Sequence, residues 1–365
     1  MSKEIYILST PRIFGGSEIF QIKLAALLQH HLHLTIVSPP LPPLQNGLAD
    51  WGAQFVELPA HGRIALRWAF LHWLWQQRRV LRADNTQIVL NGRGAAYWAP
   101  LVRLLVGYAP TIISHTELSL KYWDLKERLY GVAVRNARRV IAVSETVAAQ
   151  HRHRWPKTAV LAIPNWIDSA ITTRTPHPQS GLAISLNLAV VGRLAPGKGI
   201  EDAVIACGGL QDLELHIYGD GPLHDDLGKM AHQMSWLHLH GHVDDLAQRL
   251  PTHAILLSCS HSESFSYSVA EGIQAGLLCV ISDIPAHREL LGQDYPESLL
   301  FPVGNLQALQ NSLRAAREML TRDNGTAASE AVNRARARIR IRNAPDSARI
   351  SYLTVLAAES NFSPV

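Results

Sequence analysis

Two glutamates beside a predicted helix are the first candidates for chemistry in this sequence. Glu263 and Glu271 lie in CSHSESFSYSVAEGIQAG, which follows the apolar run AILLS and precedes a second one, LLCVIS. This order predicts a strand, a helix capped by Ser264 or Ser266, and a second strand. Glu263 would come just before the helix and Glu271 just over one turn into it. Carboxylates placed there can accept hydrogen bonds from sugar or ribose hydroxyls.

The start of the same helix is a candidate binding feature in its own right. Backbone N–H groups near Phe265–Tyr267 would point out of the helix N-terminus, where a phosphate group is stabilised. Gly276 is a suitable residue to end the helix. The alternative is an ordinary strand–helix–strand unit with two solvated glutamates, because glutamates are common near helix starts.

A second stretch, VVGRLAPGKGIEDAVI, carries two cations on a loop rich in glycine and proline. A helix is expected from about Ile200, which leaves Arg193 and Lys198 on the loop. Fixed cations suit a diphosphate, arginine as a planar fork and lysine as a point charge. The loop also fits G-x-x-x-x-G-K, but Gly199 stands where a P-loop has the serine or threonine that binds magnesium. Two surface cations without a ligand are the alternative.

Weaker candidates lie in the first half of the chain. Gly15 and Gly16 precede a predicted helix and would let the backbone approach a ligand closely, with Ser17 as a possible N-cap. His115 follows a short apolar run, so it should emerge at the carboxyl end of a strand. A plain loop fits the glycine pair equally well, and a lone histidine is more often structural than catalytic. No G-x-G-x-x-G opens either half, which disfavours a dinucleotide enzyme.

The elements that must position these residues alternate between short β-rich runs and longer helical patterns, which predicts parallel sheets flanked by helices. Helices are expected, for example, at residues 17–29, 64–82 and 118–135, and again from about Asn305. The expected strands are residues 4–9, 33–38, 54–58, 87–91, 111–114, 139–143 and 159–163 in the first half and 186–191, 213–218, 237–240, 254–258, 277–281 and 299–301 in the second.

A polar segment separates the two alternating series. It begins with residues 168–181 (DSAITTRTPHPQSG), which contain two prolines and no periodicity and are typical of an interdomain linker. Ligands of doubly wound sheets bind at the carboxyl ends of the strands. Two such domains in tandem therefore predict a binding cleft between them.

Composition limits the classes of protein to consider. A chain of 365 residues, 47% hydrophobic and 18% charged, is typical of two globular domains. The formal charge of +4 favours anionic ligands, but no nucleic-acid motif accompanies it. Three widely spaced cysteines favour a reducing compartment. The N-terminus is typical of a strand and not of a signal peptide, and no uncharged apolar run reaches the roughly 18 residues of a membrane span. We therefore expect a cytoplasmic protein, at most peripheral on a membrane.

Taken in order, the motifs resemble the GT-B glycosyltransferases of family four, the large retaining group also described as glycosyl transferases group 1. The matching pieces are GGSE (15–18), SHTE (114–117), VSE (143–145), PNWID (164–168), VGRLAPGKG (191–199), YGDGPL (218–223) and ESFSYSVAEG (263–272) with the following AGLLCVISDIPAHREL. Glu263 and Glu271, with seven residues between them, have the family's paired-glutamate spacing. Trp166 replaces a glycine that is usual in the PNWID turn.

The resemblance implies an α/β fold with two Rossmann-like doubly wound domains facing each other across a cleft. The acceptor-binding domain would span residues 1–167 and the nucleotide-sugar-binding domain residues 183–345, with a linker at 168–182. A C-terminal helix at about 346–360 would cross back onto the first domain.

The resemblance also implies roles for individual residues. Arg193 and Lys198 would neutralise the donor diphosphate, while Glu271 would bind the ribose and Glu263 the donor sugar. Gly16 would make room beside the donor phosphates, and His115 would lie near the anomeric carbon. The catalytic candidates are His115, Arg193, Lys198 and Glu263. The donor-binding candidates are Gly15, Gly16, Arg193, Lys198, Glu263, Ser264, Phe265, Ser266 and Glu271.

The implied reaction moves a sugar from a UDP- or GDP-type nucleotide diphosphate sugar to a saccharide or lipid-linked acceptor. The anomeric configuration is retained, no metal or other cofactor is required, and cell-surface polysaccharide assembly is the expected role. Nucleic acid is not an expected partner. A sugar-nucleotide epimerase or phosphorylase of the same fold remains an alternative, as does a non-catalytic nucleotide-sugar-binding subunit.

Two further patterns leave alternatives open. Residues 64–82 combine three tryptophans with four arginines, which suits a helix lying on anionic lipid, or else a core helix with one basic edge. Basic residues at 121–139 add to this pattern. His238, His240 and His242 alternate on an expected strand and could share one face. Solvated histidines at a strand end are favoured there over a metal site.

Overall fold

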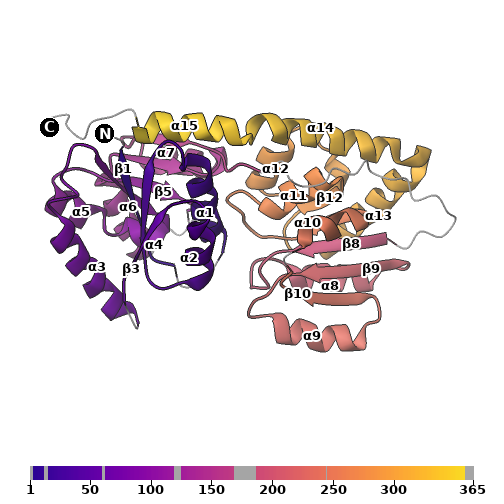
Figure 1. Cartoon of the computed structure of the whole chain (residues 1–365). Coiled ribbons are helices and arrows are strands. Elements are labelled where there is room, and N and C mark those ends of the chain that lie inside the picture. Colours follow the sequence, from indigo (N-terminus) through magenta and orange to yellow (C-terminus); the bar gives the residue numbers. More distant parts are fainter. Residues whose placement is uncertain are drawn as a thin grey trace. The chain divides into compact units, whose positions relative to one another are not determined.

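The computed structural model describes residues 3–11, 15–59, 62–118, 125–167, 186–243 and 245–357 (Figure 1). The chain forms two compact units. The first comprises Met1–Asn165 together with Pro345–Val365, and the second comprises Trp166–Ala344. The expected linker at residues 168–182 lies outside the described residues, as do the last residues of the expected C-terminal helix.

The first unit contains a seven-stranded sheet in the order β3-β2-β1-β4-β5-β6-β7, in which all neighbouring strands are parallel. Its strands are β1 (Glu4–Ser9), β2 (His33–Ser38), β3 (Gln54–Glu57), β4 (Thr86–Asn91), β5 (Thr111–Ser114), β6 (Arg139–Ala142) and β7 (Val160–Ala162). Its helices are α1 (Gly16–Leu28), α2 (Pro42–Ala49), α3 (Arg63–Gln77), α4 (Gly92–Ala96), α5 (Ala99–Val106), α6 (Leu125–Arg135), α7 (Glu145–Arg154) and α15 (Pro345–Ala357).

The second unit repeats this design with a six-stranded parallel sheet in the order β10-β9-β8-β11-β12-β13. Its strands are β8 (Leu186–Val191), β9 (Leu213–Tyr218), β10 (Leu237–Gly241), β11 (Ile255–Ser258), β12 (Leu278–Ser282) and β13 (Leu300–Phe301). Its helical segments are α8 (Ile200–Gly208), α9 (His224–Gln233), α10 (Leu246–Arg249), η1 (Leu250–Thr252), α11 (Tyr267–Ala275), α12 (Pro285–Leu291), η2 (Glu297–Leu299), α13 (Leu306–Thr321), η3 (Arg322–Gly325) and α14 (Thr326–Arg342).

Both sheets reverse their strand order once, between β1 and β4 in the first unit and between β8 and β11 in the second. In a doubly wound sheet this switch point leaves a crevice at the carboxyl ends of the strands. The central strands β4 and β11 are buried along their whole length, as expected for strands covered on both faces. The fold therefore predicts a binding feature at each switch point.

The thirteen strands expected from the sequence are all present, each within one residue of its expected bounds. Short apolar runs between turn residues were sufficient to place them. The helical tail is also confirmed, with Asn305 as the N-cap of α13: its side chain accepts a hydrogen bond of 3.0 Å from the N–H of Ala308.

Two helix predictions were wrong at one end. The helix expected at residues 64–82 ends at Gln77, where the guanidinium of Arg78 folds back onto the carbonyl of Trp75 and occupies one of the last acceptors. The helix expected from Leu118 is described only from Leu125, as α6. Leu118 itself is not helical, and its N–H donates to Gln150 Oε1 at 2.8 Å.

Within the part of the chain that the structure describes, no helix combines the length and the apolar composition that a membrane crossing requires.

Candidate functional site

The loop after β8 lies at the switch point of the second sheet and carries Arg193 and Lys198. Gly199 ends this loop with φ of +64°, and a Cβ there would lie 2.2 Å from the carbonyl oxygen of Cys259, in the segment after β11. Gly219, after β9, is equally close to this loop, since its Cβ would lie 1.9 Å from the carbonyl oxygen of Gly192. Three loops therefore meet backbone to backbone at the carboxyl end of the sheet, and glycine is required where they touch.

Lys198 and Glu263 form an ion pair at this meeting point. The Lys198 Nζ lies 2.6 Å from Glu263 Oε1, and the Ser260 hydroxyl donates to the same oxygen at 2.8 Å. The side chains of Lys198 and Glu263 are 31% and 16% exposed, so both are held in place yet reachable by a ligand. Arg193 is exposed on the same loop. The loop after β8 and the segment after β11 thus bring one predicted cation and one predicted carboxylate into contact.

Helix α11 begins beside Glu263, with Ser266 at its N-cap position and Gly276 at its C-cap in the left-handed region. Phe265 is buried directly before it. The expectation that a serine hydroxyl caps this helix was wrong: Ser266 has φ of +55°, and its side chain makes no capping hydrogen bond. Ser264, the other candidate, precedes the cap position. Glu271 lies on α11 and is half-buried.

The Ser266 hydroxyl forms a hydrogen bond with His287 and not with the helix backbone. The Nδ1 of His287 lies 2.8 Å from the carbonyl oxygen of Ser282, which can only accept, so Nδ1 carries the proton. Its Nε2 therefore accepts from the Ser266 hydroxyl, at 3.3 Å. Burial lowers the pKa of His287, which keeps the ring neutral in this role. The first turn of α11 is left without a hydroxyl cap from Ser266, an arrangement that suits an anionic ligand.

In the first unit, the candidates gather at the carboxyl ends of β1, β4 and β5. Gly15 is the N-cap of α1 and Gly16 its first residue; a Cβ on Gly16 would meet no described atom within 4 Å. The expectation that Ser17 caps this helix was wrong. Ser17 lies inside α1, and its hydroxyl donates to the Glu18 carboxylate at 2.5 Å.

Asn91, at the end of β4, fixes His115 at the end of β5. The amide nitrogen of Asn91 faces the carbonyl oxygen of Ser17 at 3.5 Å, so its Oδ1 faces His115 and must accept from the ring Nε2–H, at 2.7 Å. The ring of Phe20 stands edge-on to His115 with centroids 4.6 Å apart. Burial lowers the pKa of His115 to about 3. The imidazole is therefore a neutral hydrogen-bonding group in a fixed orientation.

Three residues around these candidates were missed by sequence reasoning, namely Ser260, His287 and Asn91. Ser260 and His287 lie within the motif segments but carry no signal in spacing alone. Asn91 had a usable signal, because it is the polar residue that ends the strand at the switch point.

Comparisons with known proteins agree with this architecture. The model of Glycosyltransferase Family 4 matches residues 14–170, and the model described as Glycosyl transferases group 1 matches residues 185–318. No curated protein sequence matches the chain.

Solved structures of similar fold cover the chain almost completely. HepE from Anabaena, crystallised with UDP-glucose, is 16% identical and superimposes with a TM-score of 0.78 over 98% of this chain and 100% of HepE. Sucrose-phosphate synthase from Thermosynechococcus elongatus is 15% identical, with a TM-score of 0.75 over 98% and 100% of the two chains. The lipopolysaccharide outer core galactosyltransferase WaaB is 14% identical, with a TM-score of 0.73 over 98% and 100%. The two family models and the two doubly wound sheets together show that the chain belongs to the family 4 glycosyltransferases (glycosyl transferases group 1) of GT-B fold.

Proposed function

We propose that this glycosyltransferase moves a sugar from a nucleotide diphosphate donor to a saccharide or lipid-linked acceptor, with retention of the anomeric configuration. The observation that carries the proposal is the Lys198–Glu263 pair beside the N-terminus of α11. A lysine, a helix N-terminus and an exposed arginine on the same loop together provide positive charge for a diphosphate. HepE, which shares the fold, was crystallised with UDP-glucose, and this favours a UDP-type donor.

Each side chain then has a role that its position supports. Before the donor binds, Lys198 and Glu263 compensate each other's charge. When the donor binds, Lys198 turns to the diphosphate with Arg193, and Glu263 contacts the hydroxyls of the sugar. Glu271 accepts from the ribose hydroxyls. The two cations stabilise the leaving diphosphate as it gains negative charge, which lowers the barrier to cleavage of the glycosidic bond.

The neutral His115 is proposed to lie near the anomeric carbon and to orient the sugar through hydrogen bonds. With its pKa near 3, it is not a general acid at physiological pH. The acceptor would attack from the face that the diphosphate leaves, and the leaving phosphate would take the acceptor proton. No protein group in this scheme requires a metal or another cofactor.

Helix α3 supports a peripheral membrane position, which would suit a lipid-linked acceptor in cell-surface polysaccharide assembly at the cytoplasmic face. Ile64, Trp68 and Trp75 are 71%, 67% and 54% exposed and recur at helical spacing, so they form one apolar stripe. Arg78 lies over the Trp75 ring at 3.9 Å. The third tryptophan of this segment, Trp73, is buried in the core and takes no part. The basic stretch at 121–139 lies partly outside the described residues.

The test combines donor binding with transfer. Purified protein is expected to melt at a higher temperature with one of UDP, GDP or ADP or their sugars, because a ligand that binds the folded state stabilises it. Lys198→Ala should lose most of this stabilisation and most of the transfer activity. Lys229→Ala, an exposed lysine on α9, is the matched control and should keep both.

The outcome also separates the alternatives. A changed sugar on the donor in the absence of any acceptor would identify an epimerase instead. Transfer by Lys198→Ala at the wild-type rate would refute the assignment of the site.

A further inference from the structure

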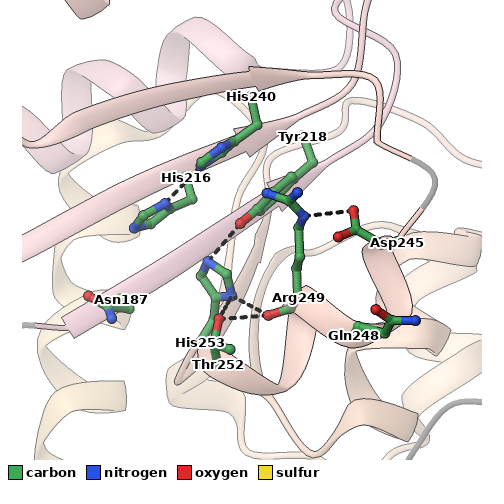
Figure 2. A pocket seen from close by; sticks show the side chains of 9 residues that line it. All are labelled: Asn187, His216, Tyr218, His240, Asp245, Gln248, Arg249, Thr252 and His253. Carbon is green, nitrogen blue, oxygen red and sulfur yellow. Dashed lines mark hydrogen bonds and ion pairs between the residues drawn. The ribbon is translucent and has the colours of Figure 1, made fainter.

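A histidine-rich cluster on β9 and β10 lies outside the candidate site. Side chains from the two strands and from the segment after α10 line a cavity of about 400 Å³ that includes His216, Tyr218, His240 and His253 (Figure 2). Strand β10 is the edge strand of its sheet and pairs only with β9 among the strands that the structure describes. The proposed sugar transfer uses none of these residues.

At the margin of this cluster, three potential metal ligands converge. The Glu214 Oε2 lies 3.5 Å from the Nε2 of His216 and 3.7 Å from the Nε2 of His238. All three ligand atoms lie within 4.8 Å of one another. The arrangement follows from the sheet: Glu214 and His216 share a face because they are two residues apart on β9, and His238 on β10 lies directly opposite His216.

The Nε2 of His238 is buried and has no hydrogen-bond partner among the described residues. Its nearest acidic atom, at 3.7 Å on Glu214, is beyond hydrogen-bonding distance. Buried polar atoms nearly always have a partner, and this nitrogen, within 4.8 Å of the Glu214 and His216 ligand atoms, is available to an ion that binds all three.

The neighbouring side chains fix the orientation of His216. Its Nδ1 lies 2.9 Å from the Nε2 of His240, whose ring stacks on Tyr218 with centroids 4.5 Å apart (Figure 2). In the tautomer in which His216 donates its Nδ1–H to His240, the Nε2 of His216 carries the lone pair that can bind an ion on the side of Glu214. Hydrogen bonding of the second ring nitrogen is the usual way in which a ligating histidine is oriented.

Tyr218, on which the His240 ring stacks, is itself held by a hydrogen bond with His253. The Nδ1 of His253 lies 3.1 Å from the carbonyl oxygen of Arg249 and must donate to it, so its Nε2 accepts from the Tyr218 hydroxyl at 3.3 Å.

We propose that Glu214, His216 and His238 form a Zn²⁺ site that ties the edge strand β10 to β9. Two imidazoles and one carboxylate are a ligand set that zinc accepts in proteins, whereas Mg²⁺ and Ca²⁺ prefer oxygen ligands alone. Glu214 and His238 are 47% and 37% exposed, so water can complete the coordination. The ion would hold together the two strands whose ends, at Gly219 and Gly241, are joined by a backbone hydrogen bond of 2.8 Å.

The experiment measures Zn²⁺ affinity of the full chain by competition with a chromogenic chelator, after removal of metal with EDTA. One ion per chain is expected, together with a melting temperature that rises with added Zn²⁺. His240→Ala removes the hydrogen bond that orients His216 and should weaken Zn²⁺ binding by roughly 10- to 100-fold. His238→Ala removes a ligand and should weaken Zn²⁺ binding by more than this. His242→Ala, a histidine beyond the end of β10, is the matched control and should bind as the wild type does.

Glu214→Gln is a second variant that tests the site if the histidine variants misfold. It keeps the shape of the side chain and removes only its charge. It should unfold like the wild type in EDTA but should lose the stabilisation by Zn²⁺. The proposal is overturned if the wild type binds Zn²⁺ no more tightly than His238→Ala, or if His242→Ala loses binding to the same extent. Sugar transfer should continue in EDTA, so failure of this proposal leaves the proposed function untouched.

Discussion

Replacing Gly199 with alanine tests how closely the loops of the second unit must approach one another. Gly199 has φ of +64° and packs against the backbone of Cys259, whereas Gly197, on the same loop, has φ of +84° and open space around its missing Cβ. Alanine at Gly197 therefore adds only backbone strain. Alanine at Gly199 adds the same strain and a Cβ that would lie 2.2 Å from a carbonyl oxygen.

The two costs can be estimated separately. A left-handed conformation costs a residue with a Cβ about 1–2 kcal/mol relative to glycine. Overpacking against atoms that cannot move away costs about 1–3 kcal/mol more. Gly197→Ala should thus lower the free energy of unfolding by about 1–2 kcal/mol, and Gly199→Ala by about 2–5 kcal/mol.

Urea titrations followed by circular dichroism give both differences, and binding of a nucleoside diphosphate gives a second readout. Gly199→Ala should also weaken nucleotide binding, because relief of the overlap shifts the loop that carries Lys198 relative to the segment that carries Glu263. Equal destabilisation by the two variants would show that the loops do not meet as closely as the structure has them. Unchanged nucleotide affinity in Gly199→Ala would refute the link between this contact and the site.

Two further predictions concern histidines of the first unit. Asn91→Ala removes the acceptor that orients the His115 Nε2–H and should lower kcat about 10-fold, because the imidazole proposed to orient the sugar loses its fixed direction; an unchanged kcat in steady-state assays would contradict this. His151 is buried, its pKa is lowered from 6.5 to about 4, and Tyr130, Glu127, Arg93 and Arg154 surround it. A lowered histidine pKa stabilises the fold above the unfolded value near 6.5, and this stability is lost as the pH falls towards 4. His151→Gln should therefore flatten the decline of stability over that pH range in denaturant titrations, and an unaltered slope would contradict the assignment.

The sequence was sufficient for the strands but not for every helix end. Strands such as β4 are short apolar runs bounded by polar turns, and both features are local. The end of α3 depends on Arg78 folding back to a carbonyl, and Leu118, expected to be helical, instead bonds to Gln150, which is 32 residues away. Helix ends that depend on such partners cannot be read from periodicity.

In the candidate site, too, local sequence patterns were sufficient for some residues, whereas others depend on partners far away in the chain. The motifs indicated Lys198 and Glu263 as site residues, and the structure brings the two side chains into contact although 65 residues separate them. The hydroxyl of Ser266 could not be assigned, because its partner His287 comes from another helix. In the histidine cluster, alternation indicated His238 and His240, but the closest imidazole to both is His216 on the neighbouring strand. Strand pairing sets that contact, and no spacing along one strand reveals it.

The return of the chain to its first unit has a consequence for biosynthesis. Helix α15 belongs to the first unit, where Tyr352 and Leu356 are fully buried and Tyr352 faces Phe20 of α1 with ring centroids 6.1 Å apart. These residues leave the ribosome only after the whole second unit has been made. The second unit can thus fold while translation continues, but the first must wait for α15 to cover α1. Premature termination between Ala344 and Tyr352 would spare the second unit and leave the first unit without this helix.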